Sequence, residues 1–143
     1  MYKRQVDEWT FACEGPRSLP YSYGYQRNSD IANVDKTYIE PDNNAWFKNR
    51  EKELERLDQS EPSGARPYHH SEFGVYDMDG GIDEFTFDPS GFDDGGNGKE
   101  AHYKSALKGG YWSVVRNRCR PVTATHNAWH HWYNQGTRCC KSI

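Results

Sequence analysis

The segment of residues 73–87, FGVYDMDGGIDEFTF, concentrates four acidic side chains around two adjacent glycines. The acidic residues are Asp77, Asp79, Asp83 and Glu84, and Gly80-Gly81 lies between them. Carboxylates this close repel one another unless water or a cation separates them, and glycines let carbonyl oxygens join the ligands of a hard ion such as calcium. The spacing is not that of an EF-hand loop. A plain β-hairpin with a Gly-Gly turn is the alternative interpretation.

The composition predicts a single domain with little regular structure. In a chain of 143 residues only 34% are hydrophobic, yet 15% are aromatic, with five Trp and ten Tyr. A core built from such residues depends on ring packing, because each buried ring removes roughly 150–250 Å² from water. The 13 Gly and 7 Pro predict many loops. One core over residues 1–143 suits this length.

Charge and hydropathy restrict the partners and the compartment. A formal net charge of −3 argues against nucleic-acid binding, which requires a basic face. The chain has no apolar run near the ~18 residues of a membrane span, and its first residues lack the apolar stretch of a signal peptide. We therefore expect neither nucleic-acid nor membrane partners, and a cytoplasmic location by default.

Two helices are expected from hydrophobic periodicity. Residues 5–13 place Val6, Trp9 and Cys13 on one face, and residues 44–59 carry apolar side chains on one stripe among mixed charges. A strand with a glycine kink is expected over residues 106–112 and continues over 114–120.

The continued strand would place three arginines on one face, namely Arg116, Arg118 and Arg120. That face either pairs with the carboxylates of residues 77–84 or points to solvent.

The histidines do not predict a zinc site. His69-His70 is interpreted as an exposed pair in a loop. His126 and His130 have the spacing of helical ligands, but the Glu of the metalloprotease motif does not accompany them.

The four cysteines leave their redox state open. Cys13 and Cys119 lie far apart, Cys139 and Cys140 are adjacent, and there is no C-x-x-C motif. A bridge between Cys13 and Cys119 would be worth about 4–5 kcal/mol in an oxidising compartment. Buried reduced thiols are the equally open alternative.

Five short motifs occur in order along the chain. They are WTFACEG at residues 9–15, GVYDM at 74–78 followed by Gly80 and Glu84-Phe85, KGG at 108–110, RCR at 118–120 and GTRC at 136–139. Together they resemble the formylglycine-generating enzyme, or sulfatase-modifying factor, family. The match covers the C-terminal half of that family's domain, so we expect the chain to lack the N-terminal part of that domain.

The resemblance implies an irregular α+β, C-type-lectin-like fold with short antiparallel strands and one or two helices. In catalytic members two cysteines after the Gly-Gly strand hold copper and use oxygen to convert a substrate cysteine to formylglycine. Here residues 111–117 read YWSVVRN, a shorter segment without cysteine. Because Cu(I) requires thiolates, the resemblance predicts the fold without copper and without this oxidation.

The resemblance also implies structural calcium and a cysteine pair. One ion would be held by the side chains of Asp77 and Glu84 and the carbonyls of Gly80 and Ile82. A second would be held by Asn33 and the Val34 carbonyl, with help from Glu61. Cys13 and Cys119 match a family pair that can be disulfide-linked.

Three functions follow from these observations. The first, which we take as the prediction, is a non-catalytic accessory or ligand-binding module with a protein, peptide or glycan ligand. The second is a ligand-display protein like the variable proteins of diversity-generating retroelements, in which rings bind the ligand: Tyr111, Trp112, Trp129 and Trp132. The third is a divergent oxidoreductase like the iron-dependent sulfoxide synthases, whose iron ligands belong to a separate domain.

Overall fold

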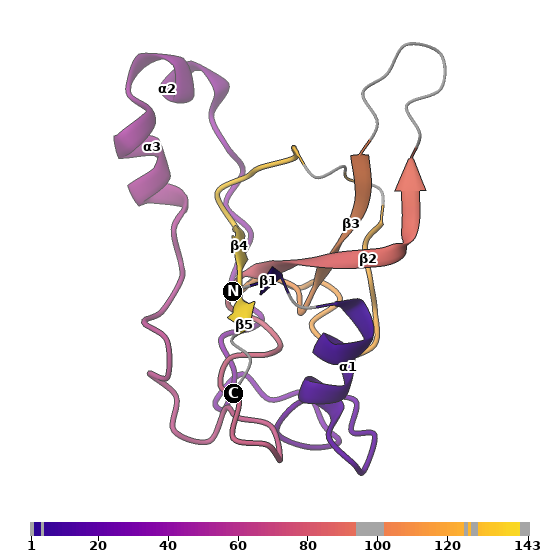
Figure 1. The fold of residues 1–143 in the computed structure, drawn as a ribbon. Coiled ribbons are helices and arrows are strands. Elements are labelled where there is room, and N and C mark those ends of the chain that lie inside the picture. Colours follow the sequence, from indigo (N-terminus) through magenta and orange to yellow (C-terminus); the bar gives the residue numbers. More distant parts are fainter. Residues whose placement is uncertain (1, 4, 94–101, 125, 127–128, 141–143) are drawn as a thin grey trace.

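The computed structural model describes residues 2–3, 5–93, 102–124, 126 and 129–140. Figure 1 shows short elements joined by long irregular segments. In chain order the elements are β1 (Tyr2–Lys3), α1 (Val6–Glu14), α2 (Asn43–Lys48), α3 (Arg50–Leu57), β2 (Asp83–Asp93), β3 (His102–Lys108), β4 (Gln135–Thr137) and β5 (Cys139–Cys140). No helix in the described ranges is both long enough and apolar enough to cross a membrane.

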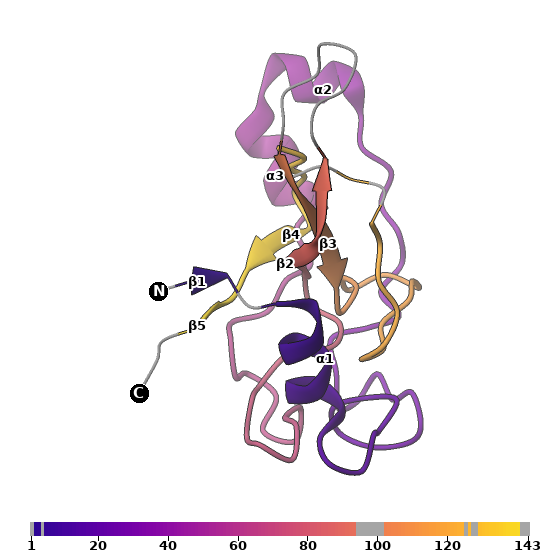
Figure 2. The same ribbon diagram turned by 45° about the vertical axis from the view of Figure 1, so that its right-hand side comes forward.

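The main sheet has the strand order β3-β2-β4. β2 pairs antiparallel with β3, where Glu84 lies opposite Lys108, and parallel with β4, where Glu84 lies opposite Gly136. β1 and β5 form a separate antiparallel pair beside this sheet (Figure 2). The sheet is therefore mixed: β2 and β3 are antiparallel, as predicted, and a long segment after β3 brings β4 back alongside β2 in parallel.

Helix α1 forms where the periodicity predicts a helix, within one residue. Gln5 and Glu8 form a capping box at its start, and Gly15 ends it with φ +64°. Its buried face carries Trp9 and Cys13, which pack with Met78 and Cys119 in the core.

The second expected helix is broken at Asn49 into α2 and α3. Asn49 has a non-helical backbone with φ −154° and ψ 86°, and its side chain accepts a hydrogen bond from the Lys52 backbone N–H. Asp42 caps α2 in the same way through the N–H groups of Asn44 and Ala45. An Asn inside an amphipathic stretch can start a new helix because its short side chain replaces the missing backbone acceptor.

The predicted strand over residues 106–120 is wrong beyond Lys108. Gly109 and Gly110 have φ values of +86° and +73°, which end the strand, and residues 114–120 form no strand. The three arginines therefore do not share a face, and each has its own partner: Asp83 for Arg116 at 2.9 Å, the Tyr21 hydroxyl for Arg118 at 3.2 Å and Glu14 for Arg120 at 2.7 Å.

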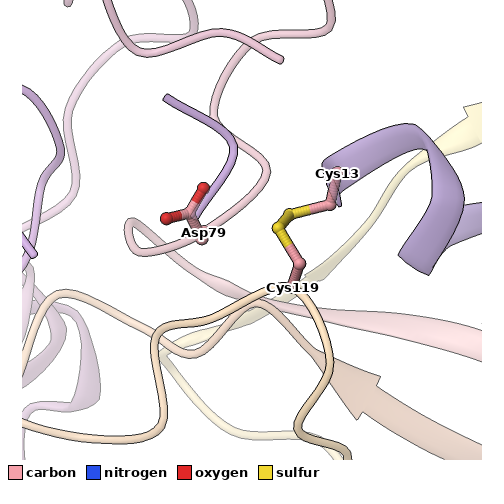
Figure 3. A group of neighbouring side chains, drawn as sticks. All are labelled: Cys13, Asp79 and Cys119. Carbon is pink, nitrogen blue, oxygen red and sulfur yellow. A yellow bond between two sulfur atoms is a disulfide. The ribbon is translucent and has the colours of Figure 1, made fainter. Parts of the chain in front are cut away.

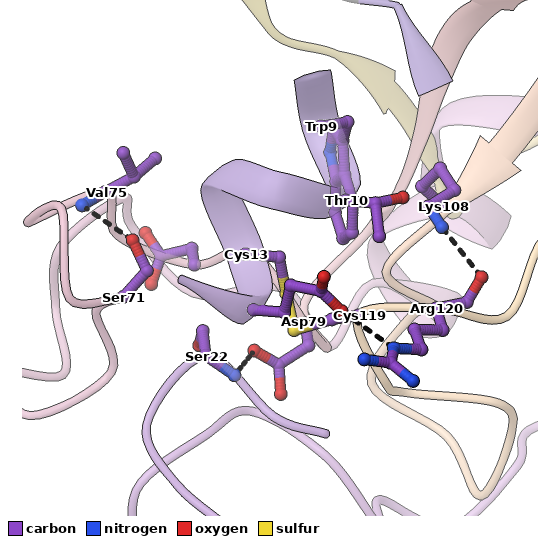
Figure 4. The surroundings of a disulfide bond; sticks show 12 residues. Trp9, Thr10, Cys13, Ser22, Ser71, Val75, Asp79, Lys108, Cys119 and Arg120 are labelled. Atoms are coloured by element: carbon purple, nitrogen blue, oxygen red, sulfur yellow. Dashed lines mark hydrogen bonds and ion pairs between the residues drawn. A yellow bond between two sulfur atoms is a disulfide. The ribbon is translucent and has the colours of Figure 1, made fainter. Parts of the chain in front are cut away.

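The core uses fewer rings than the composition predicts. Trp9 and Trp112 are fully buried, whereas Trp129, Phe47 and Tyr68 are exposed. A disulfide between Cys13 and Cys119 joins α1 to the segment after β3 and completes this small core (Figure 4).

Candidate binding sites: an acidic cavity and an aromatic cavity

The Gly80-Gly81 loop is a junction of three segments. Its N–H groups donate to the carbonyls of Gly109 at 3.0 Å and Asn33 at 2.9 Å. Gly80 has φ +85°, and an added Cβ would lie 2.7 Å from the Asn33 carbonyl oxygen and 2.5 Å from Val34 Cγ1. The plain hairpin interpretation is therefore wrong: the glycines permit close contact with the rest of the chain, and β2 starts only at Asp83.

The four carboxylates do not form one site. Asp77 and Glu84 line a cavity of about 430 Å³, which we call the acidic cavity. Asp83 lines a second cavity, and Asp79 lies beside the disulfide. Successive side chains of a strand point to opposite faces, so Asp83 and Glu84 must separate at the start of β2.

The acidic cavity brings together most of the residues predicted for calcium. Its lining includes six of them: Asn33, Glu61, Asp77, Gly80, Ile82 and Glu84. Val34 is not among the lining residues and packs against Gly80.

The carboxylate of Glu84 is already saturated by protein donors. Glu84 Oε2 accepts the Trp9 indole N–H at 2.7 Å, and Arg138 binds both oxygens at distances of 2.6–3.0 Å. Arg138 also donates to the Asp77 carbonyl at 3.2 Å. Four contacts use about all the lone pairs that a carboxylate offers, so Glu84 fits a calcium ion only if Arg138 moves.

Other oxygens of the acidic cavity fit a cation better. Asn33 is buried, and its Oδ1 has no hydrogen-bond partner within the described ranges. Asp77 uses only Oδ2 for a backbone hydrogen bond, from Gly64 at 2.7 Å. Glu61 is held by Arg66 at 2.8 Å, which lowers the pKa of Glu61. Calcium in this cavity stays a prediction, with Asn33 and Asp77 as the side chains best suited to it.

His69 is buried, so the prediction that both histidines of the His69-His70 pair are exposed is wrong for His69. Its exposed fraction is 1%, whereas His70 is exposed. The ring lies edge-on to Tyr23 at 5.5 Å, with Nδ1 3.4 Å from Asp77 Oδ1 and Nε2 3.5 Å from Asp79 Oδ1. Nothing in the local sequence indicates this burial, which depends on a ring more than forty positions away.

The second cavity, of about 430 Å³, is the aromatic cavity. Its ring-bearing walls include Tyr38, Tyr111, Trp132 and Tyr133. Burial raises the pKa of Tyr133 to about 12 and also raises that of Tyr111. Both phenols therefore remain protonated, and able to donate hydrogen bonds, at neutral pH.

An ion pair lies at the base of the aromatic cavity. Asp83 Oδ1 accepts from Arg116 at 2.9 Å and from the Gly110 backbone at 3.0 Å. Burial raises the pKa of Asp83, and Arg116 opposes this shift. Three polar atoms of the lining are buried without a hydrogen-bond partner among the described residues: Arg116 Nε, Asn134 Oδ1 and Gln135 Oε1.

The aromatic cavity contains only part of the predicted ligand-binding set. Tyr111 and Trp132 line it. Trp112 is 2% exposed and packs behind Tyr111 and Tyr133, with ring centroids 5.9 and 6.1 Å away. Trp129 is 70% exposed and does not line the cavity.

Sequence reasoning missed Arg116, Asn134 and Gln135 as members of this site. It also missed the packing of His126 and His130. Both line the cavity, their ring centroids lie 3.8 Å apart in a stack, and neither residue is assigned to a helix. Burial lowers the pKa of His130. The aromatic-rich residues 129–133 were the available signal, but their fold is irregular and has no period to read.

In catalytic members of the family that this chain resembles, the segment after the Gly-Gly strand carries two thiols. The same segment of this chain contains no cysteine. Residues 111–117 lie between the Gly109-Gly110 bend and the disulfide. Cys13 and Cys119 are bonded to each other, and Cys139 in β5 is exposed and unbonded.

A comparison with protein families decides which family the chain belongs to. Residues 5–143 match the sequence model of the sulfatase-modifying factor enzyme 1-like domain. The chain belongs to this family. The solved structure described as "Crystal Structure of CarF" is similar, with a TM-score of 0.65, 14% sequence identity and coverage of 95% of this chain. No curated protein matches the chain in sequence.

The two matches confirm the predicted family and the irregular α+β fold. The chain spans only 45% of the CarF chain, so the likeness concerns one part of that protein. The relationship to C-type lectins stays a prediction.

Proposed function

We propose that this sulfatase-modifying factor family member is a non-catalytic module that binds a polar ligand in the aromatic cavity. The observation that carries the proposal is the set of three buried polar atoms without a partner in the described structure: Arg116 Nε, Asn134 Oδ1 and Gln135 Oε1. Buried polar atoms normally have partners, and leaving one unpaired costs about 1–3 kcal/mol. These atoms have almost no accessible surface, so a ligand recovers this free energy when the side chains of the lining shift to expose them.

The chemistry of the lining indicates the class of ligand. Arg116 Nε offers a donor, while the two amide oxygens of Asn134 and Gln135 accept. Rings beside these groups provide flat apolar area next to hydroxyl donors. A glycan or a polar peptide segment presents the same mixture of hydroxyl or amide groups and apolar faces, and we propose such a ligand.

The absence of thiols from residues 111–117 supports a role without copper oxidation. Cu(I) binding requires soft ligands, and this segment supplies Tyr, Trp, Ser, Val, Arg and Asn instead. The proposal therefore includes neither copper nor conversion of a cysteine to formylglycine.

Binding of the full chain to glycan and peptide arrays tests the proposal. Gln135→Leu removes one unpaired oxygen at nearly constant volume, and Trp132→Ala removes a wall of the cavity. We expect each to weaken binding about tenfold, since the loss of one buried hydrogen bond or ring contact is worth roughly 1–3 kcal/mol. Trp129→Ala is the matched control, because Trp129 lies outside the lining. Unchanged binding by Gln135→Leu and Trp132→Ala contradicts the proposal.

A ligand-display role is the second candidate, and the exposure of Trp129 and Trp132 favours it. Exposed Trp side chains offer large contact areas at low entropic cost. In the same array experiment, a ligand-display role predicts that Trp129→Ala loses binding and that Gln135→Leu binds as well as the wild type.

We also propose structural calcium in the acidic cavity, bound by Asp77 and Asn33. A ligand that binds only the folded state raises the melting temperature, so EDTA should lower it and Asp77→Ala should abolish the EDTA response. An identical melting temperature with and without EDTA contradicts a calcium site.

A further inference from the structure

A group of metal-ligating side chains lies in the core, outside both cavities. Sulfur atoms of Cys13 and Cys119 and a carboxylate oxygen of Asp79 lie within 4.8 Å of one another, and all three residues are buried. Figure 3 shows Asp79 beside the bonded sulfurs. In the part of the chain that the structure describes, no other group of three or more such side chains comes together.

Asp79 is a buried carboxylate with incomplete hydrogen bonding. Its exposed fraction is 0%, Oδ1 accepts from the Ser22 backbone N–H at 3.0 Å, and Oδ2 has no partner among the residues described (Figure 4). A buried charge is costly unless a cation or several donors compensate it. Asp79 therefore has a free oxygen where a cation would be favourable.

His69 lies next to Asp79, outside the group of three ligand atoms that lie within 4.8 Å of one another. Its Nε2 is buried, lies 3.5 Å from Asp79 Oδ1 and lacks a hydrogen bond to any described residue. Its Nδ1 lies 3.4 Å from Asp77 Oδ1. Both ring nitrogens therefore face carboxylates, and histidines that bind metals commonly keep one such carboxylate contact while the other nitrogen binds the ion.

The acidic cavity borders this group through His69. His69 and Asp77 line the cavity, while Asp79 lies behind His69.

We propose that Cys13, Cys119, Asp79 and His69 form a redox-gated site for a thiophilic divalent cation such as Zn²⁺. In the oxidised protein the disulfide withholds both sulfurs. An external dithiol transfers two electrons and two protons to the disulfide, which becomes two thiols while the dithiol becomes a disulfide. On binding, the ion displaces both thiol protons to solvent. Two thiolates and a carboxylate then bind the ion, and the imidazole of His69 completes a tetrahedral zinc set once its ring shifts toward the sulfurs.

This inference is independent of ligand binding in the aromatic cavity. It would give the core two alternative covalent states: a disulfide under oxidising conditions and a metal crosslink under reducing conditions. Either crosslink holds α1 against the segment that follows β3, so the fold need not depend on the redox compartment.

Cobalt substitution tests the site in the full chain. The experiment uses a Cys139→Ser/Cys140→Ser background, which removes the other two thiols. The protein is reduced with dithiothreitol, desalted without oxygen and titrated with Co²⁺, whose thiolate charge-transfer absorption reports sulfur ligands. Zn²⁺ is then added to displace Co²⁺, and near-ultraviolet circular dichroism reports whether Trp9 and Trp112 remain packed.

We expect one equivalent of Co²⁺ with thiolate absorption in the reduced protein, no such absorption in the oxidised protein, and retained aromatic circular dichroism in the reduced metal complex. Asp79→Asn and His69→Gln, which preserve size and the disulfide, should each weaken Zn²⁺ binding about tenfold or more. Lack of thiolate absorption, binding only by an unfolded chain, or equal affinity in both variants would overturn the proposal.

Discussion

At the scale of single residues, Glu84 links three parts of the chain. Its carboxylate binds Trp9 of α1 and Arg138 next to β4. Its backbone belongs to β2 and pairs with Gly136 of β4. The pair with Arg138 is largely buried, with side-chain exposures of 6% for Glu84 and 27% for Arg138. A buried charge that loses its partner is strongly destabilising, whereas an exposed pair contributes little.

Glu84→Gln should therefore lower the free energy of unfolding by about 3 kcal/mol, measured by urea denaturation. The matched control is Glu14→Gln, because its partner Arg120 is 65% exposed; we expect a loss below about 1 kcal/mol. Equal losses in the two variants would show that Glu84 acts as a surface carboxylate.

Because Lys108 is buried, we expect the free energy of unfolding to rise with pH in the alkaline range. The side chain is buried over the Trp9 ring and donates to the Arg120 carbonyl at 2.9 Å. Burial lowers the pKa of Lys108 to about 8, below the ~10.4 of an unfolded lysine. Between these values the unfolded chain binds more protons than the folded chain, so folding becomes more favourable as pH rises.

The contribution of Lys108 should increase stability by about 2 kcal/mol between pH 8 and pH 10. Urea denaturation at several pH values measures it, and Lys108→Met, which preserves the linear stem, should flatten the curve. Above about pH 10 the trend reverses, since Tyr23 and Tyr133 have pKa values raised to about 12 by burial and resist ionisation only in the folded state. The same slope in wild type and Lys108→Met would refute this origin.

At the scale of elements, the Gly80 loop positions the acidic cavity. Gly80→Ala must accommodate both a positive φ and a Cβ 2.7 Å from the Asn33 carbonyl oxygen. Gly64 has a similar φ of +73°, but an added Cβ there meets no atom within 4 Å. Gly64→Ala should therefore cost about 1–2 kcal/mol from backbone strain alone, and Gly80→Ala about 2 kcal/mol more. Thermal unfolding measures both; equal costs would mean that the close contact relaxes freely.

Elements with a local cause could be predicted from the sequence, whereas those made by distant contacts could not. Periodicity locates α1, and the order of the motifs gives the family and the fold class. The break at Asn49 requires knowing whether an Asn caps or continues a helix, and both are chemically possible. The burial of His69 and the membership of Gln135 in the aromatic cavity depend on segments far along the chain. Strand alternation could have separated Asp83 from Glu84 had the start of β2 been known.

At the scale of the whole molecule, the chain has short elements joined by long segments that the disulfide, the Gly80 junction and the Glu84–Arg138 pair hold together. These connections leave two cavities on opposite faces of the start of β2. The family relationship accounts for the scaffold, and the content of the aromatic cavity accounts for the proposed binding.

The most direct test of the central claim is a nuclear magnetic resonance screen of the ¹⁵N-labelled chain against sugar and peptide fragments. We predict that the perturbed side-chain signals are the Trp132 indole N–H and the amide groups of Asn134 and Gln135. Fragments that bind without perturbing these three signals would contradict a ligand site in the aromatic cavity.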